Sequence, residues 1–285
     1  MITRVICVIL LSFVSNGEPQ YGIGSTDGVI NLDQRMNAST LREALSDMDD
    51  IRGFEDAPVD HLWDSISFDL PIPNQRRLLC AGLNYHKKYP LGGEIKLPKQ
   101  PVYFNKPPGS LVPHNAALLR PVASVQLDYE VELAVVIGRS GRHISEARAL
   151  EYVAGYTVLN DGSVRDWQRH GVAAGKNFFR SGSCGPWIVT GEAIPDPSKL
   201  SLMTRVNGEE RQNAKVSEMI FSVPELIAYM SRIMPLEPGD IIATGSPEGT
   251  GGSMEPQVWL SDGDAVEFEI TDLGILSNTV EDEII

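Results

Sequence analysis

Two glutamates separated by one residue lie in an apolar stretch from Leu127 to Ile137. The two-residue period of a β-strand would place Glu130 and Glu132 side by side on one face. The far end of the stretch is apolar on both faces, which predicts a strand buried on both sides. Two buried carboxylates repel each other, so at least one is expected to be neutral. A hard divalent cation would relieve this repulsion, since it prefers carboxylate oxygens. An edge strand with two solvated glutamates is the alternative that this stretch leaves open.

A third carboxylate, Asp161, follows the apolar segment 153–159 at an Asn-Asp-Gly turn. Functional carboxylates commonly lie where a strand ends in a loop, although such a turn is also common without any function. Arg165 and Gln168 follow Asp161 at spacings of four and three residues. One helical turn would place all three side chains on a single face.

A glycine-rich segment, 244–252, comes later in the chain. It lacks the Gly-Lys-Ser/Thr ending of a phosphate-binding loop, so a nucleotide site is not expected. Exposed backbone N–H groups of such a loop can hold an anion, and here they are candidates for binding a substrate carboxylate.

The elements that must position these residues are mostly short β segments separated by Gly and Pro. A capping box of Ser222 and Glu225 predicts one longer helix with a buried apolar stripe. Many short strands with few helices indicate an antiparallel or mixed β roll or sandwich. The expected strands are 153–159, 187–190, 202–206, 211–212 and 241–244, followed by two more near the C-terminus.

The N-terminal part is expected to form a small domain, residues 1–70, ahead of a catalytic domain, residues 71–285. An apolar run at 5–14 is either a short signal peptide or the first strand of a β-hairpin with an Asn-Gly turn. The run is too short to span a bilayer and leads directly into the turn, which favours the hairpin and a cytoplasmic protein. A short strand at 28–32 and a helix with a capping box of Thr40 and Glu43 are expected to follow.

Composition narrows the class of partner. The chain has 285 residues, of which 42% are hydrophobic, and a formal net charge of −14. Neither nucleic acid nor an anionic membrane attracts an acidic surface, so neither is expected as a partner. The three cysteines, Cys7, Cys80 and Cys184, have no CxxC spacing, which excludes a cysteine zinc site and is typical of reduced thiols in the cytoplasm.

Seven motifs now combine into a family pattern. They occur in this order: Gly82-Leu83-Asn84-Tyr85, Phe104-Asn105-Lys106-Pro107, 129–138, 155–166, Gly175-Lys176-Asn177-Phe178, Gly185-Pro186-Trp187 and 238–247. Together they make about 200 residues, from Leu79 to Asn278, resemble the fumarylacetoacetate hydrolase family.

The resemblance implies an α+β, mostly β fold: a mixed β-sandwich roll with a small N-terminal domain. It implies one Mg²⁺ or Mn²⁺ per chain, small-molecule substrates that are 2-oxo acids or β-diketones, and a homodimer. The implied metal ligands are Glu130, Glu132 and Asp161. The implied catalytic residues are Lys176, Gln168 and Arg165. Candidate substrate-binding residues are Thr244, Gly245 and Ser246.

One motif departs from the family pattern. Many members carry a histidine four residues after the Asn of Gly-x-Asn-Tyr and a glutamate three residues further, on a lid that activates water. Here those positions are Lys88 and Leu91. His86 and Glu94 lie two and three residues away and are candidate replacement bases, although either could be a plain surface residue. Lys88 is a candidate substrate-binding cation.

The first functional prediction is therefore a metal-dependent hydrolase that cleaves a C–C bond in an acylpyruvate or β-diketone, through an enolate held at the metal. The alternative is an isomerase, tautomerase or decarboxylase of a 2-oxo diacid of the oxaloacetate or hydroxymuconate type. A third possibility, a member without catalytic activity, conflicts with the intact acidic residues and Lys176. The lid separates the first two, because only hydrolysis requires a base that activates water.

Overall fold

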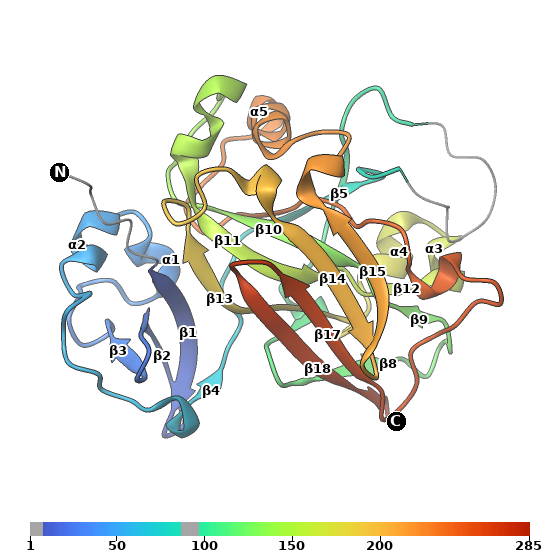
Figure 1. The fold of residues 1–285 in the computed structure, drawn as a ribbon, viewed down its shortest axis with the longest axis horizontal. Coiled ribbons are helices and arrows are strands. Elements are labelled where there is room, and N and C mark those ends of the chain that lie inside the picture. Colours follow the sequence, from blue (N-terminus) through green and yellow to red (C-terminus); the bar gives the residue numbers. More distant parts are fainter. Residues whose placement is uncertain (1–7, 87–96) are drawn as a thin grey trace.

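The structure, a computed structural model, describes residues 8–86 and 97–285 and is built on two sheets (Figure 1). An eleven-stranded sheet forms the centre, and a five-stranded sheet packs against part of it. The first has the order β3 (Val29–Asn31), β2 (Glu18–Gly24), β1 (Ile9–Ser15), β13 (Gly182–Thr190), β11 (Val153–Asn160), β10 (Val131–Ile137), β16 (Ile241–Ala243), β5 (Leu78–Gly82) and β6 (Val102–Asn105), with β4 (Ser67–Phe68) and β7 (Leu111–Val112) attached at the side.

The five-stranded sheet has the order β15 (Glu209–Lys215), β14 (Ser201–Val206), β17 (Ala265–Ile270), β18 (Gly274–Asp282) and β8 (Ala117–Arg120). A two-stranded ribbon joins β9 (Leu127–Asp128) to β12 (Ser163–Val164). The α-helices of the described residues are α1 (Leu41–Ala44), α2 (Met48–Arg52), α3 (Arg165–Gln168), α4 (Val172–Lys176) and α5 (Val223–Ile233), and short 3-10 helices lie between other elements. Parallel pairs, such as β5 with β16, occur among mostly antiparallel ones, so the predicted mixed, mostly β fold is confirmed.

Strand β10 shows why the fold has two apolar layers. Leu133 and Val135 belong to one hydrophobic cluster, which includes residues of the five-stranded sheet and α5. Ala134 and Val136 belong to a second cluster, on the side of the N-terminal helices. Because successive side chains of a strand point to opposite faces, β10 contributes to both layers and is buried along its whole length.

The predicted N-terminal hairpin is present in the described residues. Strands β1 and β2 pair in antiparallel register around Asn16 and Gly17, which both have positive φ (52° and 82°). This backbone conformation is typical of the tight turn that an Asn-Gly pair favours. Strand β1 also pairs with β13 at Ile9–Val189, so the central sheet continues from the N-terminal part into the remainder of the chain. The predicted division after residue 70 stays a prediction.

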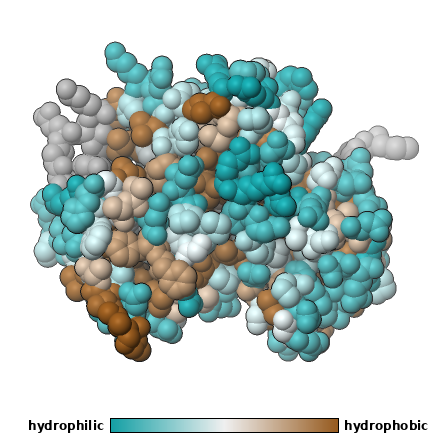
Figure 2. Space-filling view, turned by 180° about the vertical axis from the view of Figure 1, so that it is seen from behind, coloured by the Kyte–Doolittle hydropathy of each residue, from teal (hydrophilic) through white to brown (hydrophobic). Residues whose placement is uncertain are grey.

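The start of α5 agrees fully with the capping box predicted from the sequence, whereas the start of α1 differs from its predicted capping box. Ser222 and Glu225 form the predicted capping box at the start of α5. Thr40 caps α1, but the Glu43 carboxylate accepts its hydrogen bond from the N–H of Ser39 at 3.0 Å instead of closing a capping box. Within residues 8–86 and 97–285, no helix is long and apolar enough to cross a membrane. Figure 2 shows hydrophilic residues over much of the face opposite to that of Figure 1, with hydrophobic residues gathered on the left side of that view.

Candidate metal and substrate site

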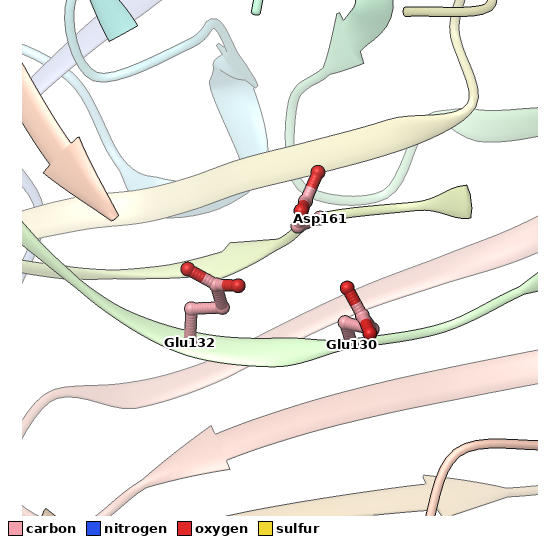
Figure 3. A group of neighbouring side chains, drawn as sticks. All are labelled: Glu130, Glu132 and Asp161. Carbon is pink, nitrogen blue, oxygen red and sulfur yellow. The ribbon is translucent and has the colours of Figure 1, made fainter. Parts of the chain in front are cut away.

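Three carboxylates meet where β10 begins and β11 ends. The register of these strands pairs Val131 with Asn160, which brings Glu130 next to Asp161. The N–H of Asp161 donates to the carbonyl oxygen of Glu130 at 2.9 Å. One carboxylate oxygen from each of Glu130, Glu132 and Asp161 lies within 4.8 Å of the other two. Figure 3 shows both glutamates projecting from the same side of the chain at the start of β10, with Asp161 on the neighbouring segment at the end of β11.

Three buried cations surround this triad. The Nζ of Lys176 contacts Oε2 of Glu130 and lies 2.6 Å from Oδ2 of Asp161. Nζ of Lys106 lies 2.9 Å from Oδ1 of Asp161. Arg165 donates from Nη2 to Oε1 of Glu130 at 2.9 Å. Two of the three carboxylates are therefore neutralised by protein cations.

Glu132 differs from its two neighbours. Its Oε2 accepts a hydrogen bond from the N–H of Gly245 at 2.8 Å, and no lysine or arginine of the described residues forms an ion pair with it. Burial raises the pKa of Glu132 well above the ordinary glutamate value, and repulsion from Asp161 and Glu130 raises it further. Both effects favour the neutral form of Glu132 in the metal-free site, which is the direction that the sequence pattern predicts.

Lys176 remains charged despite its burial. Burial alone would lower the pKa of this lysine, but the carboxylates of Asp161 and Glu130 outweigh that effect and raise it above the ordinary value. Lys176 is therefore an ammonium group at neutral pH. It can donate hydrogen bonds and stabilise negative charge, but it cannot accept a proton.

The donor set fits a divalent metal ion. At the site, four buried acidic residues, Asp128, Glu130, Glu132 and Asp161, outnumber by one the three buried cations Lys106, Arg165 and Lys176. The three grouped oxygen donors are the ligand type that hard divalent cations prefer. With all four acids ionised the site has one surplus negative charge, which a proton on Glu132 offsets in the metal-free site. A divalent ion would replace that proton.

A cavity with about 630 Å³ of empty space opens beside the triad. Its lining residues are Ala81, Gly82, Leu83, Val102, Phe104, Glu130, Glu132, Asp161, Arg165, Gln168, Val172, Lys176 and Ser246. The polar groups lie together at the triad, whereas β6 and α4 contribute apolar side chains. A ligand that combines a chelating acid with a hydrocarbon portion would match this division.

The structure brings together most of the residues predicted from the sequence. Lys176, Gln168, Arg165 and Ser246 all line the cavity with the triad. Thr244 has another contact: its N–H donates to the carbonyl oxygen of Leu133 within the sheet region. The predicted substrate contacts of Thr244 and of Gly245, whose N–H is bound to Glu132, stay predictions.

Two geometric expectations need correction. Helix α3 begins only at Arg165, so Asp161 does not share a helical face with Arg165 and Gln168; sheet pairing of β11 positions it instead. The N–H groups of segment 244–252 were candidates for binding a substrate carboxylate. Those of Gly251 and Gly252 donate instead to the protein carboxylate of Asp128, because a buried carboxylate requires such donors.

The lid residues are only partly described. His86 is exposed and is not among the residues that line the cavity. Lys88 and Glu94 lie outside the described residues. The predicted roles of these three residues stay predictions.

Sequence reasoning did not assign Lys106 and Asp128 to the site. Lys106 holds Asp161 and also donates to the backbone oxygens of Gly162 and Lys176. Asp128 binds Arg165, with 2.7 Å between Oδ2 and Nε. Both residues have apolar neighbours in the sequence, and a charged residue buried among such neighbours requires a partner. The sequence therefore indicates that each of these residues needs a buried partner, but it does not identify that partner.

Comparison with known proteins identifies the family of this chain. The model of the fumarylacetoacetate (FAA) hydrolase C-terminal family matches residues 77–281, and the chain belongs to this family. A rat protein named "Oxaloacetate tautomerase Fahd2a, mitochondrial" is 40% identical over 218 residues, which cover 75% of this chain and 69% of the rat protein.

Two solved structures add detail. Fumarylacetoacetate hydrolase from Exiguobacterium antarcticum is 34% identical, with a TM-score of 0.82 over 97% of this chain and all of that chain. Maleylpyruvate hydrolase from Sphingobium sp. SYK-6, solved in complex with manganese(II) and pyruvate, is 26% identical, with a TM-score of 0.81 over 97% of this chain and all of that chain. The chain is therefore similar to enzymes of more than one reaction type.

Proposed function

We propose that this chain is a divalent-metal-dependent tautomerase or isomerase of 2-oxo dicarboxylic acids, with oxaloacetate as the first substrate to test. The observation that carries this proposal is the acidic triad with Lys176 beside it, in a chain 40% identical to an oxaloacetate tautomerase. Tautomerisation moves a proton between C3 and the 2-oxo oxygen. It requires stabilised charge on that oxygen and does not require attack by water.

Glu130, Glu132 and Asp161 would hold Mg²⁺ or Mn²⁺, and the manganese and pyruvate of the Sphingobium structure support this choice. The ion supplies Lewis-acid polarisation of the 2-oxo group when it is bound. Arg165 keeps Glu130 in place through its 2.9 Å hydrogen bond, and Gly245 keeps Glu132 in place. The protein thus fixes the orientation of the ligands before the substrate arrives.

Lys176 and Gln168 would act on the substrate directly. Lys176 is a fixed ammonium group in the cavity wall, so it stabilises negative charge on the substrate oxygen during proton transfer. Gln168 accepts a hydrogen bond from Arg165 through Oε1 at 3.1 Å, which leaves its amide N–H₂ to bind a substrate oxygen.

The experiment measures the decay of enol-oxaloacetate by ultraviolet absorbance, with purified protein and Mg²⁺ or Mn²⁺. The free ion and the Glu132→Gln variant are the controls, since metal ions alone also act on oxaloacetate. We expect decay that requires both the wild-type protein and the ion. Decay no faster than with the free ion would contradict the proposal.

Hydrolysis of an acylpyruvate is the second candidate, because the chain is also similar to the two hydrolases described above. The same preparation should therefore be tested with acylpyruvates and with a hydroxymuconate-type dienoate. A higher kcat/KM for acylpyruvate cleavage than for oxaloacetate tautomerisation would make the hydrolase the better assignment. In that case the variants His86→Ala and Glu94→Gln would show whether either residue activates the water.

A further inference from the structure

Asp128 is a buried carboxylate that the proposed chemistry does not use. It ends β9, a strand that lies beside β12 (Figure 1). It pairs with Ser163 of β12 and lies two residues before Glu130. Its exposed fraction is 0%. A carboxylate is placed in such a position only with compensating partners, so its contacts indicate its role.

Four hydrogen bonds satisfy this carboxylate. Oδ1 accepts from the N–H groups of Tyr129 at 2.9 Å and Gly251 at 2.7 Å. Oδ2 accepts from the N–H of Gly252 at 3.0 Å and from Nε of Arg165 at 2.7 Å. An ionised carboxylate offers about four lone-pair sites. Asp128 therefore has no acceptor capacity left for a substrate or an ion.

The glycine-rich segment is shaped to make these contacts. A Cβ atom at Gly251 would lie 1.9 Å from the carbonyl oxygen of Val258 and 3.0 Å from Oδ1 of Asp128. Only a residue without a side chain can bring its N–H to Asp128 at this point. The loop that contributes Ser246 to the cavity is thus fixed to Asp128 a few residues later.

Arg165 extends the contact to the site itself. With Nε bound to Asp128, its Nη2 donates to Oε1 of Glu130 at 2.9 Å and its Nη1 to Oε1 of Gln168 at 3.1 Å. The guanidinium group is planar, with its donors in a fixed fork, so fixing one edge fixes the other two. Arg165 is 2% exposed and is enclosed in this orientation.

We infer that Asp128 is a positioning residue that acts through Arg165 to orient the metal ligand Glu130 and the substrate-binding amide of Gln168. The inference rests on the proposed metal site. Asp128 also balances the charge of Arg165, so that Arg165 is shared between two carboxylates. Without that balance, Glu130 is the carboxylate that remains in contact with Arg165 in the described part of the chain, and the guanidinium group competes with the ion for it.

The first test is Asp128→Asn, which keeps the shape and removes the charge. We expect Mn²⁺ affinity to fall about tenfold or more, as is common when a residue behind a metal ligand is changed. We also expect KM for enol-oxaloacetate to rise, because Gln168 loses its fixed orientation. Mn²⁺ affinity is measured by titration calorimetry or by electron paramagnetic resonance of free Mn²⁺.

Asp240→Asn is the matched control. Asp240 is also buried and binds an arginine through two contacts, of 3.0 Å and 2.6 Å with Arg77. It lies at the opposite end of β10, where its carbonyl oxygen accepts from Ile137. We expect this variant to lower the melting temperature without changing Mn²⁺ affinity. Equal loss of affinity in both variants, or none in Asp128→Asn, would overturn the inference.

Comparing the double variant Asp128→Asn/Arg165→Met with Arg165→Met alone tests whether Asp128 acts through Arg165. The same comparison replaces the first test if Asp128→Asn alone does not fold. Removing both charges leaves no unpaired buried ion from this pair, so the double variant is expected to fold. Adding Asp128→Asn to Arg165→Met should change Mn²⁺ affinity by less than twofold. A further large loss would show that Asp128 acts by another route and would overturn the inference. Failure of the wild-type protein to bind Mn²⁺ would overturn the proposed metal site itself. This outcome is distinguishable from failure of the Asp128 inference, in which the wild type binds Mn²⁺ and only the variants behave otherwise than expected.

Discussion

At the scale of single residues, Glu132 decides whether the site can hold a metal ion. Glu130 and Asp161 each have a lysine partner, whereas the partner of Glu132 among residues 8–86 and 97–285 is the N–H of Gly245. Glu132→Gln keeps the shape and removes the ligand charge, so we expect Mn²⁺ binding to be lost with little change in fold. Elemental analysis measures the metal content, and the exposed Glu248→Gln is the control. Stoichiometric Mn²⁺ in the Glu132 variant would show that the ligand assignment is wrong.

The raised pKa of Glu132 also predicts how the stability of the metal-free protein depends on pH. Below the ordinary glutamate pKa, the folded and unfolded states both carry the proton. Between that value and the raised pKa, the folded state keeps a proton that the unfolded state has lost. The contribution of Glu132 to stability is therefore full at low pH and is lost as pH rises through its raised pKa.

The measurement is the melting temperature against pH in a chelator, for wild type and for Glu132→Gln. The wild type should lose stability relative to the variant as pH rises, because glutamine does not titrate. Apparent Mn²⁺ affinity of the wild type should increase over the same pH range, since the ion displaces the proton. A difference between the two proteins that does not depend on pH would rule out this titration.

Another prediction at this scale concerns the role of the Lys176 side chain in catalysis. Lys176→Met removes the ammonium group from the cavity wall while keeping most of the volume, and kcat for the active substrate should fall about 10²-fold or more. Mn²⁺ binding should persist, because the three ligands remain. The exposed Lys199→Met is the control. Unchanged turnover in the Lys176 variant would exclude its role in stabilising charge.

At the scale of elements, the periodic pattern of 127–137 predicted much of the site but not its details. The alternation of side chains is confirmed, since Leu133 and Ala134 pack in different clusters. The strand, however, is interrupted before Val131, because side chains replace the sheet contacts there. The N–H of Glu130 donates to Oδ1 of Asn160, and the N–H of Val131 donates to Oε1 of Gln212. No local pattern contains those two partners.

The same limit applies to the elements that surround the triad. The Asn-Gly hairpin and the capping box of α5 were predictable because each depends on residues a few positions apart. The partners of Lys106 and Asp128 lie 56 and 37 residues away, at Gly162 and Arg165. Such pairs are fixed by how β5, β6, β10 and β11 lie in the sheet. The sequence therefore predicted the three carboxylates that the structure brings together, but not the cations that contact them.

At the scale of the whole molecule, the net charge and the expected homodimer bear on which partners the protein binds. The net charge of −14 is unfavourable for contact with nucleic acid or an anionic membrane. The homodimer and the cytoplasmic location expected from the sequence stay predictions. Sedimentation velocity of the purified chain would test the first, and a mass of one chain at all concentrations would contradict it.

The shared core predicts that the N-terminal part and the catalytic part unfold together. Leu45 of the N-terminal part belongs to the same hydrophobic cluster as Leu159 and Ile188 of the central sheet. Leu45→Ala should lower the free energy of unfolding by about 2–5 kcal/mol, as for other buried leucines. Urea denaturation followed by circular dichroism should show one transition for the wild type and one for Leu45→Ala, and the exposed Leu62→Ala should change the wild-type transition little.

Mn²⁺ should shift the whole wild-type transition to higher urea, because the ion binds only the folded chain. Two transitions, of which Mn²⁺ moves one and Leu45→Ala the other, would show instead that the two parts are separate folding units.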